Sequence, residues 1–252
     1  MSSLFKYFPA EYIKDTKTGK RRNYALENLK SNTLWASIPD AFNDPFECDF
    51  YFTKDDMLNY MLLEYPQMKQ QINNMRNDPN ECARIETSYA YMQSEMEQIK
   101  KQFGVTCFSM SDSELLMWGH YANCHRGLCV EYDAAEIKPD ITVKIVDYDT
   151  ELLRLRNFSD DALKESAERV LHTKSKEWSY ENEVRVIIFP IQIGLPGTTW
   201  EAPTPKSIRL GVKADERLKA EIIDLCKDKG IELYQMEKVP GQYAIEKRKI
   251  EL

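Results

Sequence analysis

The hydrophobic pattern changes twice along the chain. Near the start, short runs of alternating apolar and polar residues predict strands at 4–8 and 33–37. From 54 to 102, apolar residues recur every three or four positions, which predicts helices, with a break at the turn sequence 77–80. The remainder mixes both patterns without regular alternation of strand and helix. We therefore expect one α+β domain over 1–252, with a mixed or mostly antiparallel sheet and a helical insertion at about 54–102.

The same patterns predict the other elements. Expected strands lie at 105–109, 127–132, 141–148, 180–189, 207–211, 231–235 and 244–249. Expected helices lie at 24–30, 114–123, 160–173 and 215–229, the last closed by Gly230.

Charge and composition narrow the function classes. The chain has 252 residues, of which 42% are hydrophobic and 30% charged, as in ordinary globular proteins. Its net charge of -7 argues against broad nucleic-acid binding, which needs a basic face. The apolar runs are too short for a membrane span, and the start lacks the pattern of a signal peptide. We expect a cytoplasmic protein.

The six cysteines contain no Cys-x-x-Cys pair, so neither a zinc site nor a disulfide framework is indicated. The nearest approach to a metal cluster is His120, Cys124, His125 and Cys129, whose spacing matches no standard tetrahedral site, and we expect no metal. Cys107 with His120 or His125 is an alternative nucleophilic pair. Because Cys107 lies in an apolar strand, we expect a raised thiol pKa.

The run 174–189 is the most informative segment. In its second half, Glu181, Glu183 and Arg185 occupy one phase, and apolar residues occupy the other. Because residues two apart in a strand share a face, this spacing predicts two carboxylates and a guanidinium in one row. The row could bind or attack a polar substrate, or it could be the solvent face of a half-buried strand.

Three further segments carry polar or aromatic groups that could complete a site. Lys6 and Tyr7 lie on the first strand, and Asn43 and Asp44 lie in a rigid loop before a proline.

In the third segment, a strand ends at Ser109 and a Ser/Asp-rich turn starts a helix, where hydroxyl and backbone N–H groups could receive an anion. Trp118 and Tyr121 lie three apart on that helix and could form one stacking face. A capped helix with an aromatic core face remains the alternative.

In combination, these motifs resemble a bacterial family, domain of unknown function 2971, from residue 4 to about 210. The motifs are Lys-Tyr near the start, a strand with Ser before Pro, Phe-Asn-Asp-Pro-Phe-Glu, Cys-Phe-Ser, Leu-Met-Trp-x-x-Tyr-Ala, His-x-Gly and Trp-x-Tyr-Glu-x-Glu-x-Arg. This resemblance implies no activity.

The layout is also similar to that of NAD-dependent ADP-ribosyltransferases, which implies an activity. Those enzymes carry a basic residue on an early strand, a Ser-containing middle strand and a later catalytic Glu, positions matched here by Lys6, Ser109 and the pair Glu181 and Glu183. The implied reaction is transfer of ADP-ribose from NAD to an unknown acceptor, or hydrolysis of NAD. A carboxylate would stabilise the oxocarbenium character that develops as the nicotinamide bond breaks.

The resemblance implies catalytic roles for Glu183 and Glu181, with Glu183 as the stabilising carboxylate. The expected cofactor-binding residues are Lys6, Tyr7, Asn43, Asp44, Ser109, Trp118, Tyr121 and Arg185. A non-catalytic sensor that binds a nucleotide or another small anion with the same residues is the second hypothesis.

Overall fold

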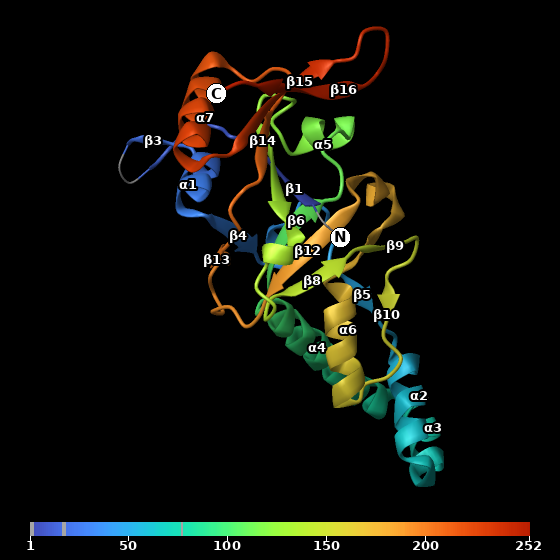
Figure 1. Cartoon of the computed structure of the whole chain (residues 1–252). Helices are drawn as coiled ribbons and strands as arrows, with labels where there is room; N and C mark the ends of the chain where they lie inside the picture. The colour runs from blue at the N-terminus through green and yellow to red at the C-terminus, as the bar shows by residue number, and fades with distance from the viewer. Residues whose placement is uncertain (1–2, 17–18, 77) are drawn as a thin grey trace.

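The computed structural model describes residues 3–16, 19–76 and 78–252, and a ten-stranded sheet runs through it (Figure 1). Its strands are β1 (Ser3–Phe8), β4 (Thr33–Ser37), β6 (Gly104–Ser109), β7 (Leu128–Asp133), β8 (Thr142–Ile145), β12 (Glu183–Ile188), β13 (Gly197–Glu201), β14 (Ser207–Leu210), β15 (Glu232–Lys238) and β16 (Ile245–Ile250). The order is β13-β4-β6-β1-β7-β14-β15-β16, with β12 between β6 and β8. Only β14 and β15 pair in parallel among the described strands of this sheet, so the expected α+β class with a mostly antiparallel sheet is confirmed.

Two helices cover one face of the sheet, α1 (Tyr24–Ser31) and α7 (Glu216–Lys229). Side-chain caps start both helices: Asn23 accepts from the Leu26 N–H, and Asp215 accepts from the Leu218 N–H. Gly230, at φ 67°, closes α7 as expected. The apolar face of each helix packs on inward residues of β7, β14 and β15, which forms the main hydrophobic core.

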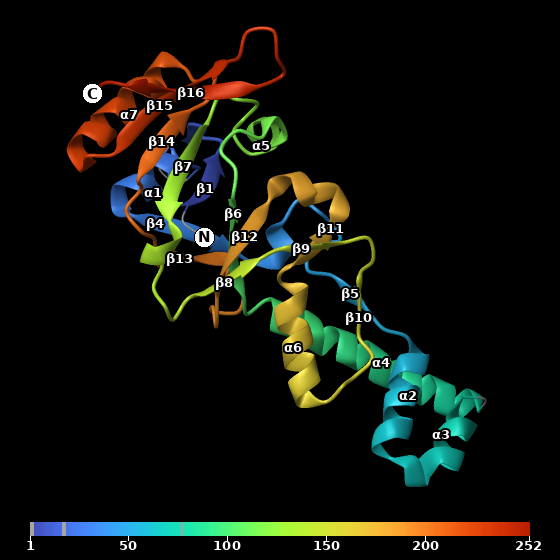
Figure 2. The same ribbon diagram turned by 45° about the vertical axis from the view of Figure 1, so that its right-hand side comes forward.

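The opposite face is covered in part by α4 (Pro79–Lys100) and α6 (Asp160–Val170). Met96 of α4 packs in a second core with Val170 and with Ile187 of β12. The helices α2 (Lys54–Glu64) and α3 (Lys69–Met75) pair with the start of α4 around a small core of their own. Figure 2 shows α2 and α3 extending away from the sheet, whereas the end of α4 lies against it.

Expected element bounds fail where the backbone turns sharply. The expected strand 180–189 starts only at Glu183, because 176–181 form the 3-10 helix η4 (Lys176–Glu181) and Asn182 is left-handed at φ 44°. The expected helix 114–123 is the shorter α5 (Leu115–His120), and positive φ angles follow at 123–125. The expected strand 141–148 divides into β8 and β9 (Asp147–Asp149).

Several short elements carried too weak a pattern to be expected. They are β2 (Ile13–Lys14), β3 (Arg21–Arg22), η1 (Pro39–Ala41), β5 (Phe50–Tyr51), η2 (Pro66–Met68), η3 (Ala134–Glu136), β10 (Leu153–Arg154), β11 (Thr173–Ser175) and the sheet strand β13. The parallel pairing of β11 with β9 lies next to η4, and Lys174 of β11 contacts Glu183 at the start of β12.

The edge of β6 that faces away from β12 is shared by two strands. Ser37 of β4 pairs with Val105 at one end of β6, and Phe5 of β1 pairs with Ser109 at the other end. Val105 and Ser109 are four positions apart, which is about 13 Å at the usual rise of a strand. Because β1 and β4 separate there, the sheet opens into a gap between them.

In the described part of the chain, no helix has both the length and the apolar character needed to cross a bilayer.

The packing of α4 yields a stability prediction. Met96 is 4% exposed in the second core, so Met96→Ala should lower the free energy of unfolding by about 2–5 kcal/mol. Tyr91, on the same helix and 64% exposed, is the control, and Tyr91→Ala should change it by less than about 0.5 kcal/mol. Urea unfolding of both variants measures the difference. Equal, small effects would show that α4 does not belong to the sheet core.

Candidate functional site

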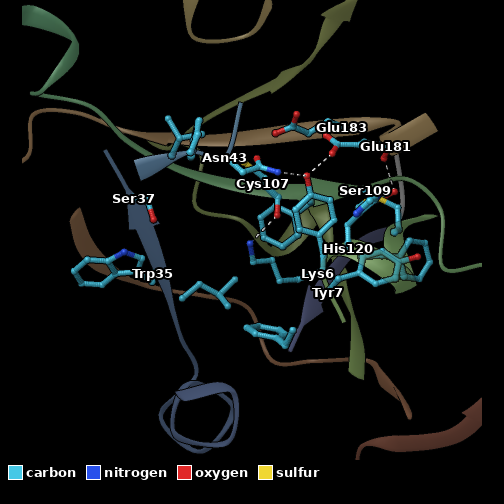
Figure 3. Close-up of a pocket in the computed structure, with 18 of the residues that line it drawn as sticks. Lys6, Tyr7, Trp35, Ser37, Asn43, Cys107, Ser109, His120, Glu181 and Glu183 are labelled. Carbon is cyan, nitrogen blue, oxygen red and sulfur yellow. Dashed lines mark hydrogen bonds between the residues drawn. The ribbon is translucent and has the colours of Figure 1, made fainter. Parts of the chain in front are cut away.

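A pocket of about 530 Å³ occupies the gap between β1 and β4 (Figure 3). This volume lies in the range of small-molecule sites in proteins. The polar and aromatic residues that line it are Phe5, Lys6, Tyr7, Phe8, Asn28, Trp35, Ser37, Phe42, Asn43, Glu47, Cys107, Phe108, Ser109, His120, Tyr121, Lys174, Glu181 and Glu183.

Lys6 enters the gap from β1 and is partly buried. Its ammonium donates to the carbonyl oxygen of Cys107, in the stretch of β6 between the two strand pairings, at 3.0 Å. Among the described residues it forms no ion pair within 4.0 Å. Burial lowers the pKa of Lys6, and the nearby Cys107 and Glu183 oppose this shift. Because burial disfavours the charged amine and no ion pair with a described residue within 4.0 Å compensates, an anionic ligand beside Lys6 would favour its protonation.

Glu181 lies at the opposite side of the pocket and is held by two donors. The Tyr121 hydroxyl donates to its Oε1 at 2.5 Å, and Lys174 donates to its Oε2 at 2.6 Å. Burial raises the pKa of Glu181, and these two donors oppose that rise. Asn43 makes a long contact of 3.5 Å with the Tyr121 hydroxyl, which brings the 42–47 loop to the same end of the pocket.

Glu183 is bound more tightly than Glu181. Arg185 donates to both of its oxygens, at 2.9 and 3.1 Å, and Lys174 lies 3.3 Å away. Burial alone raises the pKa of Glu183, but Arg185 and then Lys174 outweigh it and bring the pKa to about 2. Glu47 completes the cluster by pairing with Arg185 and, at 3.3 Å, with Lys174. Three carboxylates and two cations thus meet in one buried network.

Seven of the ten expected site residues line this one pocket, namely Lys6, Tyr7, Asn43, Ser109, Tyr121, Glu181 and Glu183. The expected row of carboxylates and guanidinium is present in part. Glu183 and Arg185 share a face of β12, but Glu181 precedes the strand in η4.

The other three expected site residues lie outside the pocket wall and make structural contacts. Arg185 is fully buried behind Glu183, and Asp44 accepts from the Phe46 N–H in a turn. Trp118 is fully buried, donates from its indole to the Asp112 carbonyl and packs edge-on against Tyr7. The expected shared stacking face of Trp118 and Tyr121 is therefore wrong, because Trp118 belongs to the core while Tyr121 reaches Glu181.

Ser109 lies at the pocket wall with its hydroxyl already engaged. It donates to the Glu181 carbonyl at 2.6 Å and accepts from the Ser111 N–H at 3.1 Å. Ser109 therefore positions the backbone of Glu181 within the protein.

Several pocket residues were not expected as site residues. Lys174 begins the polar run 174–189 and Glu47 ends the 42–47 loop, but no spacing rule connects them. Trp35 and Ser37 share the phase of β4 opposite the buried Leu34 and Ala36, so the alternation of this strand is the signal that indicates them.

Cys107 and His120 both line the pocket, but burial disfavours the thiolate that the cysteine alternative needs. As expected, burial raises the pKa of the Cys107 thiol well above its ordinary value. Cys124 is exposed while Cys129 is buried, and His125 stacks near Trp118. Over 3–16, 19–76 and 78–252, no group of three or more His, Cys, Asp or Glu residues is arranged to hold a metal ion.

The comparison with protein families agrees with the first resemblance. Residues 117–186 match the family described as Protein of unknown function (DUF2971). The resemblance is confirmed for this segment, which is shorter than the expected 4–210. It contains both Tyr121 and Glu181, whose side chains meet in the pocket. No curated protein and no solved structure matches the chain.

The matched segment also contains the His-x-Gly motif, and the structure gives a reason for its glycine. A Cβ atom at Gly127 would lie 2.0 Å from the carbonyl oxygen of Phe8, so the turn before β7 can pass β1 only without a side chain.

The two carboxylates should differ in their effect on stability. Glu183→Gln removes a charge that Arg185 and Lys174 stabilise, and it should lower the free energy of unfolding by about 2 kcal/mol. Glu181→Gln should cost much less, because burial disfavours the charged form of Glu181. Chemical unfolding at pH 7 compares the two variants.

The pH dependence of stability provides a second test of the ion pair between Glu183 and Arg185. The pKa of Glu183 falls from an ordinary 4.5 to about 2 on folding, so its contribution is complete above pH 4.5 and is lost as the pH falls from 4.5 towards 2. The stability difference between wild type and Glu183→Gln should therefore shrink over that interval. A difference independent of pH would contradict the assigned ion pair.

Proposed function

We propose that the pocket between β1 and β4 binds NAD and that the protein breaks the nicotinamide–ribose bond, either to transfer ADP-ribose or to hydrolyse NAD. The observation that carries this proposal is that Lys6 and Glu181 line different walls of the same pocket. The fold of the ADP-ribosyltransferases remains part of the proposal. Its support is a mostly antiparallel sheet that opens at β6.

In this proposal, Lys6 receives a phosphate oxygen of the dinucleotide. Its lack of an ion-pair partner among the described residues supports this role, because a phosphate would restore the charge balance around it. Tyr7, whose hydroxyl donates to the Ser111 carbonyl, and Asn43 contribute further pocket wall near the reacting end.

Glu181 is the better candidate for the reacting carboxylate. Glu183 already faces two cations, so little of its charge is available to a ligand, whereas Glu181 shares one cation and a neutral hydroxyl. As nicotinamide leaves, the carboxylate of Glu181 would stabilise positive charge at the ribose carbon. Water or an acceptor then forms the new bond to that carbon and loses its proton. Glu183 would hold Lys174 and so position Glu181.

A sensor that binds a nucleotide without turnover is the second candidate. The complete pairing of the carboxylates favours it, since Glu47, Glu181 and Glu183 each contact Lys174 within 3.3 Å. Such a site would bind NAD and leave it intact.

The carboxylate assignment predicts a kinetic difference. Glu181→Gln should reduce nicotinamide release about a hundredfold or more, because it removes the charge that matters as the bond breaks, and NAD affinity should change little. Turnover is measured as the release of labelled nicotinamide from NAD, and NAD affinity is measured by calorimetry. Glu177→Gln, an exposed change in the same 3-10 helix, is the control. Binding by the wild type without turnover under any acceptor condition would favour the sensor.

The role of Lys6 predicts a change in binding. Lys6→Met should weaken NAD affinity about tenfold or more, since a charge-assisted hydrogen bond to phosphate is lost. Lys6→Arg keeps the charge and should weaken affinity less. Calorimetric titration of both variants measures this. Equal affinity of wild type and Lys6→Met would remove Lys6 from the site.

A further inference from the structure

Trp35 lies at the end of the pocket away from Glu181 (Figure 3). Its neighbours on β4, Leu34 and Ala36, are fully buried in the main core, so Trp35 and Ser37 point to the opposite side of the strand. The side chain of Trp35 remains 42% exposed. An indole left this open in a pocket wall offers a flat apolar surface to a ligand.

The indole ring is held in place by the strand beside it. A Cβ atom at Gly197 of β13 would lie 2.7 Å from the indole Cζ2, so the ring packs directly on the backbone of β13. The carbonyl oxygen of Trp35 also accepts from the Thr106 hydroxyl at 2.8 Å, which fixes β4 against β6. The indole ring of Trp35 is therefore preorganised, so a ligand that stacks on it does not pay the entropy cost of fixing the side chain.

Figure 3 shows Lys6 between Trp35 and Glu181, and Ser37 beside Trp35. Along the pocket, the aromatic ring of Trp35 is thus followed by the amine of Lys6 and then by the carboxylate of Glu181. ADP-ribose, the part of NAD without nicotinamide, presents matching groups in the same order: an adenine with its ribose, then two phosphates, then a second ribose.

We propose that Trp35 is the base-stacking residue of the site, so that the purine of a dinucleotide lies on its indole, the phosphates lie at Lys6 and the second ribose reaches Glu181. This inference rests on the proposed function for the identity of the groups at Lys6 and Glu181. It adds the orientation of the ligand and the residue that selects a dinucleotide over a mononucleotide.

Stacking on Trp35 would determine which ligands bind the site more tightly than others. Every base has a flat face, so the indole ring of Trp35 can stack on adenine and guanine alike. A ligand without a purine gains no binding energy from this stacking. NAD and ADP-ribose should therefore depend on Trp35. Nicotinamide mononucleotide, which lacks the adenosine half, should not.

The test uses the full chain and calorimetric titration with NAD, ADP-ribose and nicotinamide mononucleotide. Trp35→Leu should weaken NAD and ADP-ribose about tenfold or more, because stacking on an aromatic ring is lost. Trp35→Phe keeps a smaller ring and should weaken them less. Tyr91→Leu, an exposed aromatic outside the pocket, is the matched control and should bind as wild type does. Thermal melts verify that the variants are folded.

The outcomes separate this inference from the proposed function. If Trp35→Leu weakens binding of NAD or ADP-ribose and leaves mononucleotide binding unchanged, the inference is supported, whether or not NAD is consumed. A lack of NAD consumption would refute only the catalytic part of the proposed function. Equal affinity of wild type and Trp35→Leu for all three ligands, or no binding of a purine nucleotide by the wild type, overturns the inference. NAD consumption measured in the same samples tests the proposed function separately.

Discussion

Lys174 is the side chain on which the site depends. It is almost fully buried and contacts carboxylates from three elements: Glu47 from the loop after η1, Glu181 from η4 and Glu183 from β12. Burial alone lowers the pKa of Lys174, but the three carboxylates outweigh it and keep the amine charged. Because a buried charge without partners is very costly, these three segments can pack together only when all the charges meet.

Arg185 extends the same constraint into the second core. It pairs with Glu47 and Glu183 and donates to the Leu171 carbonyl at 2.8 Å, at the end of α6. The inner face of β12 thus carries charge where a sheet usually carries apolar side chains. This network fixes the carboxylate end of the pocket, and the parting of β1 from β4 forms its open end.

Local patterns could predict faces and element types, but they could not predict the partners of a side chain. Alternation correctly placed Glu183 and Arg185 on one face, and the closing Gly230 correctly marked the end of α7. It failed at Glu181, because a left-handed Asn182 separates that residue from the strand.

Helical spacing likewise put Trp118 and Tyr121 on one surface. The packing of Trp118 against Tyr7 and the reach of Tyr121 to Glu181 are tertiary contacts that three-residue spacing does not contain. Local patterns could not predict Lys174 as a site residue either, because its contacts are also tertiary: one partner, Glu47, lies 127 residues away in the chain. Motif order across the whole chain carried more information about the pocket than any single motif, because seven of the ten expected residues converge on it.

The most direct test of the central claim, that the gap between β1 and β4 is a nucleotide site, is a crystal structure of the protein soaked with ADP-ribose. The account predicts ligand density in this gap, with a phosphate within hydrogen-bond distance of Lys6 and the terminal ribose beside Glu181. An empty gap with ADP-ribose bound elsewhere on the protein would contradict it.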